Sequence, residues 1–311
     1  MKLPLITIAL CTYNRAESLR KYSMPAIEQV TYPNYEVIVV DDHSPEPVEQ
    51  VLHDYPTKIE HLSILRNGRN RGLPFSRNRA LAHAQGSIIV FMDDDVSPFP
   101  DCLDEIAELY INDPDLMFTW GCVYQCHGSH DWNAPTFGTG SLFSLRQVLA
   151  DYFQFDTNIR YFKTYGCEEH DLARRVQRQG LKIVRAEKAR ANHYQAPAKD
   201  RKWRGLGGDL NFLYEALKTG SVMTYYVCLL KGIIIAIKRI RHGKDFDPTL
   251  ASHPYKTALE TAYLLAVLLR DRKFATAAKW LFYVLLDIPI RASIRGRIEA
   301  KQASGLQATL N

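Results

Sequence analysis

Three apolar runs in the first hundred residues have the length and the β-branched content of buried strands. They are Pro4–Leu10, Glu36–Val40 and Ser87–Met92. Two stretches of helical length that mix polar and apolar residues, Ala16–Val30 and Pro47–Tyr55, lie between them. Strands that alternate with helices in this way predict βαβ units and an α/β fold, with a mostly parallel central sheet flanked by helices.

Clustered carboxylates follow two of these runs. Asp41 and Asp42 come after the second, and Asp93, Asp94 and Asp95 come after the third. Ligands collect at the carboxyl ends of parallel strands, so both clusters are expected at one edge of the sheet. Adjacent acids repel one another and usually need a cation between them. The pattern predicts a divalent metal site and a phosphate-bearing substrate; a solvated acidic turn is the alternative.

Composition indicates a globular protein and does not by itself indicate a function. With 311 residues, 46% hydrophobic and 23% charged, the chain is typical of a globular protein with one large core or a core and an accessory domain. Six cysteines form no framework pattern, which favours a reduced, cytosolic compartment. Leu3–Cys11 is similar to a short signal segment, but Leu10 is too large to precede a cleavage site, so we interpret it as the first strand.

Charge divides the chain in two. Residues 1–180 hold 16 Lys and Arg against 24 Asp and Glu, whereas residues 181–311 hold 23 against 10. Opposite charges predict different partners for the two parts. We place the boundary near residue 200, in the polar stretch Gln195–Asp200. The expected organisation is an α/β domain at 1–200, a basic amphipathic helical region at 201–292, and a poorly ordered tail at 293–311.

Apolar and basic positions recur with helical spacing in Ser221–Arg241, Thr257–Leu269 and Ala275–Ile290. The longest uncharged run, Thr219–Leu230, has 12 residues, fewer than the roughly 17–25 of a membrane-spanning helix. We therefore expect residues 221–291 to lie on a membrane surface, at its inner face; a soluble helical subdomain or a homo-oligomer contact is the alternative. The basic residues alternate with aliphatic ones and form no recognition motif, which argues against nucleic-acid binding.

Six motifs follow one another in a characteristic order along residues 4–195. They are Thr12-Tyr13-Asn14-Arg15, Asp41-Asp42-His43-Ser44, Asn70-Arg71-Gly72 with Arg77-Asn78, Asp93-Asp94-Asp95, Phe155-Asp156 and Glu168-Glu169-His170-Asp171-Leu172. In order and spacing the chain resembles the family 2 glycosyltransferases, which have the Rossmann-like GT-A fold and invert the sugar's configuration.

The resemblance implies a nucleotide-diphosphate sugar donor and a divalent ion, Mn²⁺ or Mg²⁺. Asp95 is then the metal ligand, Asp94 approaches the ribose, and Asp93 supports the turn. His193 stands where some related enzymes have a further metal ligand, although a lone histidine is also compatible with a structural role.

The same resemblance assigns the nucleotide to the first two motifs. Thr12, Tyr13 and Asp42 would hold the base, with Tyr13 stacking on it and Asp42 accepting the N3–H of uracil or thymine. UDP or dTDP is thus the preferred donor. Arg77 would lie near the base or the diphosphate, or else pair with a nearby acid. The nucleotide-sugar-binding residues expected in total are Thr12, Tyr13, Asn14, Arg15, Asp42, Arg77, Asp93 and Asp94.

Glu169 occupies the position of the family's general base, and Glu168 is its nearest rival. One carboxylate base without a nucleophile implies a single in-line displacement. Gly140 would belong to a loop over the acceptor, and Trp132, among polar residues, would stack on an acceptor sugar. We expect a helix to begin at Asp171 and to run to Gln179.

The sequence therefore predicts a metal-dependent, inverting transferase acting on a hydroxyl of a glycan or lipid-linked acceptor. A catalytically degenerate scaffold that binds nucleotide or glycan is the alternative. A sugar-phosphate nucleotidyltransferase needs a glycine-rich phosphate loop near the N-terminus, and the segment Cys11–Arg15 contains no glycine.

Overall fold

The computed structural model describes residues 3–127, 130–131, 139–161, 166–194, 206–218, 222–227, 229–230, 268 and 272–310. The chain divides into two compact units. The first comprises residues 1–157, 168–201 and 309–311, and the second comprises residues 158–167 and 202–308. The division after residue 201 lies next to the boundary expected near residue 200. The sequence did not indicate that 158–167 joins the second unit.

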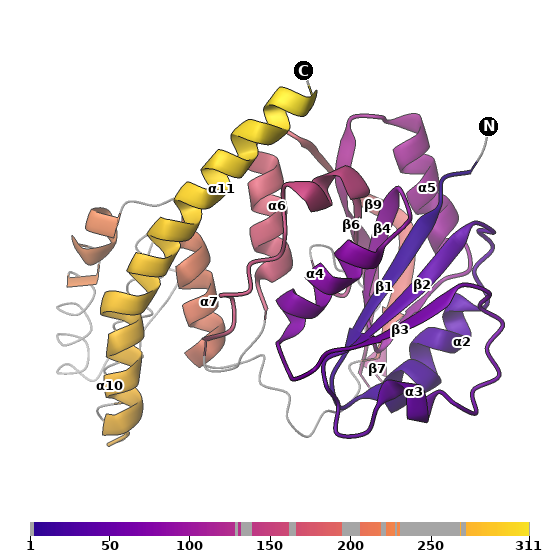
Figure 1. Ribbon diagram of the computed structural model, residues 1–311, viewed down its shortest axis with the longest axis horizontal. Coiled ribbons are helices and arrows are strands. Elements are labelled where there is room, and N and C mark those ends of the chain that lie inside the picture. Colours follow the sequence, from indigo (N-terminus) through magenta and orange to yellow (C-terminus); the bar gives the residue numbers. More distant parts are fainter. Residues whose placement is uncertain are drawn as a thin grey trace. The chain divides into compact units, whose positions relative to one another are not determined.

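The first unit is built on a nine-stranded mixed sheet, and its main path has the order β3-β2-β1-β4-β8-β6-β9-β5 (Figure 1). Strands β3, β2, β1 and β4 are parallel, as are β6 and β9, while β8 and β5 pair antiparallel with their neighbours. The prediction of an α/β fold with a parallel core is confirmed. The strands are β1 (Ile6–Thr12), β2 (Tyr35–Asp41), β3 (Leu62–Arg66), β4 (Ile88–Asp93), β5 (Val96–Pro98), β6 (Leu116–His127), β7 (His130–Asp131, paired with β6), β8 (Leu142–Arg146) and β9 (Lys182–His193).

Short helical segments cover this sheet. The stretch expected as one helix at 16–30 is helical from Ala16 to Ile27, with a π-helical turn at Leu19–Ser23. The helix expected at 47–55 is shorter, because only Val48–Val51 is helical. The helices of this unit are α1 (Ala16–Ser18), α2 (Met24–Ile27), α3 (Val48–Val51), α4 (Leu73–His83), α5 (Cys102–Asn112), a 3-10 turn (Gln147–Asp151) and α6 (Glu168–Arg178).

The register of the parallel strands determines where the site forms. Thr12 of β1 lies beside Asp41 of β2, and Cys11 lies beside Asp93 of β4. The three strands therefore end together, and the polar residues that follow them meet at one edge. Their interior side chains are fully buried against the helices; Ile8, Leu10, Val39 and Val90 belong to one continuous core. Burial of these side chains stabilises the strands by about 1.5–3 kcal/mol each.

Most of the described residues of the second unit are helical, whereas those at 158–160 and 166–167 lie in turns and irregular structure. Its helices include α7 (Leu206–Leu217), α10 (Phe274–Phe282) and α11 (Ile288–Leu310), with a π-helical turn (Tyr283–Asp287) between the last two. Residues 222–227 and 229–230 are also helical. Tyr214, Trp280 and Ile288 lie in its core. Among the described residues no helix is both long and apolar enough to cross a membrane.

Helix α11 extends through the segment that we expected to be poorly ordered. Ion pairs between residues four apart support it, since Arg291 contacts Asp287 and Arg295 contacts Glu299. Glu299 also accepts a 2.9 Å bond from the buried Lys218 Nζ. Most of the amphipathic segments expected at 221–241 and 257–269 lie outside the described residues.

Candidate active site

The three consecutive acids form the turn between β4 and β5. Asp93 is the last residue of β4, and Val96 begins β5. The antiparallel pairing of β5 with β9 places Val96 beside His193, and the Tyr194 N–H donates to the Asp95 carbonyl at 3.0 Å. Strand pairing therefore brings His193 to the acidic turn from about a hundred residues away in the sequence.

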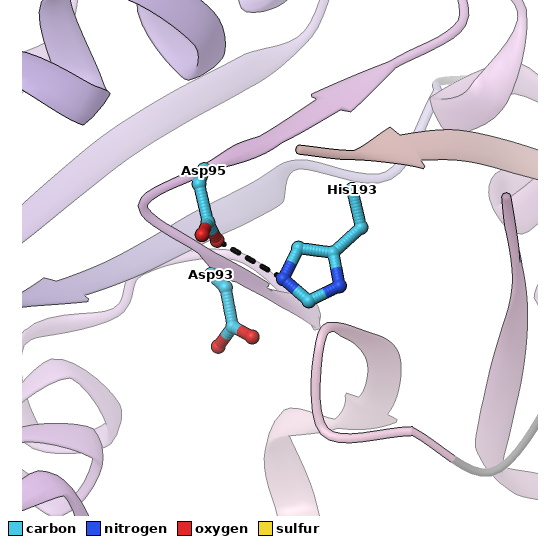
Figure 2. A group of neighbouring side chains, drawn as sticks. All are labelled: Asp93, Asp95 and His193. Carbon is cyan, nitrogen blue, oxygen red and sulfur yellow. Dashed lines mark ion pairs between the residues drawn. The ribbon is translucent and has the colours of Figure 1, made fainter. Parts of the chain in front are cut away.

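Asp93, Asp95 and His193 each offer one ligand atom, and these atoms lie within 4.8 Å of one another (Figure 2). His193 Nε2 faces Asp95 Oδ1 at 3.2 Å. The Asp95 side chain is fully buried, while that of Asp93 is 27% exposed. The group is thus closed on the protein side and accessible at Asp93. Sequence reasoning expected Asp95 and His193 as ligands and gave Asp93 to the nucleotide.

The orientation of His193 suits a metal ligand. Its Nδ1 lies 2.9 Å from Gln125 Oε1 and 3.4 Å from Ser141 Oγ. An amide oxygen only accepts, so Nδ1 carries the proton and Nε2 of the neutral ring presents its lone pair to Asp95. His193 Nε2 and Asp95 Oδ1 are then both acceptors, and their close approach is favourable when a cation lies between them or when the ring is protonated. Two carboxylates and one imidazole are a donor set that fits Mn²⁺.

Asp94 is held away from this group. Its Oδ2 accepts a 2.6 Å bond from Thr12 Oγ1, and its Oδ1 lies 2.8 Å from Arg15 Nη2. The same Arg15 nitrogen also pairs with Asp95. Burial raises the pKa of Asp94 to about 7, which Arg15 opposes and Asp95 reinforces. Thr12 and Arg15, both expected at the nucleotide, therefore contact the acidic turn directly.

Asp42 organises the loop before α4. Its Oδ1 accepts from the backbone N–H of Arg71 at 2.8 Å and from Asn67 Nδ2 at 2.7 Å, and its Oδ2 accepts from the Gly72 N–H at 2.7 Å. Gly72 has a φ of 90°, which glycine adopts without strain. Three of the roughly four acceptor directions of this carboxylate are thus used within the protein.

Tyr13 and Asn14 lie at the surface of the same edge. The Tyr13 side chain is 41% exposed, which leaves its ring accessible for stacking. Asn14 has a φ of 55°, and its N–H donates to Ser44 Oγ at 2.9 Å. The second motif thus fixes the turn that presents Tyr13.

Arg77 lies beneath the site and is buried. Its Nη1 lies 3.0 Å from Glu168 Oε1 and 3.4 Å from Glu169 Oε2, and its Nη2 donates to the Gly140 carbonyl at 3.0 Å. Asp93 Oδ1 is 3.7 Å away from Nη2. Arg77 therefore makes the pairing with acids that the sequence left open as an alternative. It also connects the group Asp93, Asp95 and His193 to the glutamate pair.

Glu168 and Glu169 form the first turn of α6, which begins three residues earlier than expected. Gly166 and Cys167, with φ of 123° and 81°, precede the helix. Acids at this end are stabilised by the helix dipole. Asp171 instead pairs with Arg175 at 3.0 Å within α6. Burial raises the pKa of Glu169, Arg77 lowers it, and the net shift is upward.

Two further motifs meet at α4. Asn78 Nδ2 donates to the Phe155 carbonyl at 2.8 Å, and the Phe155 N–H donates to Asn78 Oδ1 at 2.7 Å. The ring of Phe155 lies 5.5 Å from the Arg77 guanidinium. These contacts hold Arg77 in place.

Most residues that the sequence predicted for the site lie within the described part of the structure. Gly140 lies against Glu169, and Trp132 is outside the described residues. Gln125 and Ser141 were missed by sequence reasoning. Gln125 lies beside His193 through the β6–β9 pairing, which contains a register shift that no local pattern signals.

The family described as Glycosyl transferase family 2 matches residues 7–173, more than half of the chain. An uncharacterized glycosyltransferase of Methanocaldococcus jannaschii is 31% identical over 123 residues, 39% of this chain and 42% of that one. The glucosyl-dolichyl phosphate glucuronosyltransferase of Haloferax volcanii is 25% identical over 217 residues, 60% of this chain and 68% of that one. The match thus spans less than half the length of the first relative.

Two solved structures share the architecture. A mannosyltransferase of Pyrobaculum calidifontis in complex with GDP-Man and Mn²⁺ has a TM-score of 0.52 and 18% identity, over 99% of this chain and 87% of that one. GalNAc-T7 with UDP, GalNAc and Mn²⁺ has a TM-score of 0.55 and 12% identity, over 69% of this chain and 48% of that one. These likenesses show the fold, which is the GT-A fold predicted from the sequence.

Proposed function

The chain belongs to glycosyl transferase family 2, and we propose that it transfers a sugar from a nucleoside-diphosphate donor to a hydroxyl of a glycan or lipid-linked acceptor. One observation carries the proposal. The ligand group Asp93, Asp95 and His193 and the buried pair Glu168 and Glu169 are connected through a single guanidinium, that of Arg77.

In this proposal Asp93, Asp95 and His193 hold a divalent cation, Mn²⁺ or Mg²⁺. When bound, the cation neutralises the charge that develops on the departing nucleoside diphosphate. Both similar structures contain Mn²⁺, which supports the assignment.

The nucleotide lies along the first two motifs. Tyr13 stacks on the base with its exposed ring, and Asp42 accepts a base N–H with its remaining acceptor direction. Asp94, which accepts a hydrogen bond from Thr12, faces the ribose. Arg15 contacts the diphosphate and, when it does so, gives up part of its ion pairing with the acids. The N3–H of a uracil or thymine base can donate to this remaining direction of Asp42, and we propose UDP or dTDP as the preferred donor.

Glu169 acts as the general base. It takes the proton of the acceptor hydroxyl as that oxygen bonds to the anomeric carbon; the bond from this carbon to the diphosphate breaks, and the nucleoside diphosphate leaves with the electron pair. One displacement inverts the anomeric configuration. Burial raises the pKa of Glu169, which makes it a stronger base than an exposed glutamate. Arg77 orients its carboxylate.

The test is transfer by the full chain with UDP-sugars and Mn²⁺, compared with Glu169→Gln. We expect the variant to bind UDP as the unaltered chain does and to lose about 10²–10⁴-fold in transfer. Glu49→Gln, an exposed acid on α3, is the matched control and should leave transfer unchanged. Undiminished transfer by Glu169→Gln would contradict the base assignment, whereas nucleotide binding without transfer to any acceptor would favour the scaffold alternative.

A further inference from the structure

Large apolar side chains lie exposed along α10 and α11, which continue into each other as one rod (Figure 1). Phe282, Leu286, Ile290 and Ile294 are 53%, 54%, 57% and 48% exposed. They recur at every fourth residue, and we call them the apolar stripe. Four large hydrophobic side chains in one line exceed the scattered exposure that is normal for a surface.

The stripe is not needed to form the core of the second unit. Ile288 and Ala292, which alternate with the stripe residues along the rod, are fully buried in that core. At 3.6 residues per turn they face the side opposite to Ile290 and Ile294. The rod is therefore apolar on two sides, and only one of them packs within the unit.

A neighbouring helical segment repeats this arrangement. Tyr225 is buried, and its hydroxyl donates to the Val284 carbonyl at 3.2 Å, so residues 222–227 pack beside the rod. On the same segment Met223 and Val227 are exposed. Two adjacent helical segments thus leave apolar side chains uncovered.

The charge around the apolar stripe indicates what kind of partner it binds. Within residues 272–310 the chain has seven Lys and Arg and two acids. Both acids contact basic groups, because Asp287 accepts from Arg291 Nε at 2.8 Å and Glu299 from Lys218 Nζ at 2.9 Å. Exposed cations stand beyond both ends of the stripe, Arg272 and Lys273 at one end and Arg297 and Lys301 at the other. The surroundings of the stripe are therefore strongly positive.

We propose that the apolar stripe binds an anionic lipid bilayer, with the rod lying in the plane of the interface. The four apolar side chains enter the boundary between headgroups and acyl chains, and the flanking cations attract the headgroups. A second copy of the chain would bring two positive rods together, which is unfavourable. The proposal uses no residue of the candidate active site, so it stands or falls independently of the transferase activity.

The experiment is co-sedimentation of the full chain with vesicles of phosphatidylcholine, with and without phosphatidylglycerol. We expect binding to the anionic vesicles, weakened by salt, and a loss of at least about tenfold in Leu286→Glu/Ile290→Glu. Arg297→Ser/Lys301→Ser should lower anionic binding by about fivefold for each charge removed. The matched control is Ile111→Glu, an exposed apolar residue on α5, which should bind as the unaltered chain does.

Far-ultraviolet circular dichroism and thermal unfolding check that each variant remains folded. Equal binding of Leu286→Glu/Ile290→Glu and the unaltered chain to anionic vesicles would overturn the proposal. So would sedimentation equilibrium showing that the unaltered chain is a dimer, that this variant is a monomer, and that neither binds vesicles, because the stripe would then bind a second copy.

Discussion

The backbone of Gly140 lies directly against the carboxyl group of Glu169. A Cβ at residue 140 would come within 2.8 Å of both Glu169 Cδ and Oε1. The Gly140 carbonyl also accepts from Arg77, whose other terminal nitrogen contacts Glu169. Only glycine lets this backbone approach so closely. We therefore interpret Gly140 as a positioning residue for the proposed base, a different role from the acceptor contact expected from the sequence.

Gly140→Ala should displace the Glu169 carboxylate and lower transfer by about a hundredfold, because small displacements of a catalytic group have effects of that size. UDP and Mn²⁺ binding should stay within about threefold. Gly68→Ala is the matched control, since a Cβ there meets no atom within 4 Å. Equal transfer rates for the two variants would show that residue 140 does not position the base.

Arg77→Met should destabilise the first unit by about 3 kcal/mol, because it removes a buried cation and leaves its carboxylate partners in place. Transfer should fall as well, since Glu169 loses its orienting contact. Thermal unfolding followed by circular dichroism measures the change. Arg69→Met, at an exposed position, is the control. A melting temperature shared by both variants would contradict a stabilising role for the ion pairs of Arg77 with Glu168 and Glu169.

The pH dependence of transfer should follow the ionisation of the Glu169 carboxyl group. A general base works when ionised, and burial raises the pKa of Glu169 above its ordinary value of 4.5. As pH falls through this raised pKa the carboxylate is protonated and kcat declines, so the acidic limb should lie at higher pH than for an exposed glutamate. A kcat that stays constant down to the ordinary pKa would exclude Glu169 as the base.

Gln125→Leu should weaken Mn²⁺ binding by about 10–100-fold, because partners behind a metal ligand contribute that much to affinity. The amide oxygen of Gln125 fixes the His193 ring with Nε2 toward Asp95. Titration of Mn²⁺ by electron paramagnetic resonance measures the free ion. The control is Gln177→Leu, at an exposed position on α6. An unaltered Mn²⁺ affinity in Gln125→Leu would contradict the assignment of His193 as a metal ligand.

The parallel half of the sheet could be predicted because its signals are local. Apolar runs of strand length identified β1, β2 and β4, and the acids after β2 and β4 indicated the edge at which they end. The acid clusters alone predicted a divalent metal site at this edge. The assignment of Asp95 and His193 as its ligands came from the resemblance, since no local pattern connects residues about a hundred positions apart.

Contacts that depend on tertiary pairing could not be predicted. Gln125 reaches His193 through a strand pairing with a register shift, and Arg77 reaches Glu168 from a helix 91 residues earlier. The early start of α6 was missed because Glu168 and Glu169 read as catalytic acids, although acids also favour the first turn of a helix. For α11, pairs such as Arg295–Glu299 stabilise a helix in the terminal segment 293–311, which we expected to be poorly ordered.

Calorimetric titration of UDP with and without Mn²⁺ tests directly whether Asp93, Asp95 and His193 form a metal-assisted donor site. We expect Mn²⁺ to strengthen UDP binding at least about tenfold in the unaltered chain and in the control Asp101→Asn, an acid outside the group. In Asp95→Asn, UDP binding should no longer depend on Mn²⁺. GDP, titrated in the same way, is the control for the choice of base. UDP binding that is indifferent to Mn²⁺ in the unaltered chain, or equally Mn²⁺-dependent in Asp95→Asn, would contradict a metal-assisted donor site at this turn.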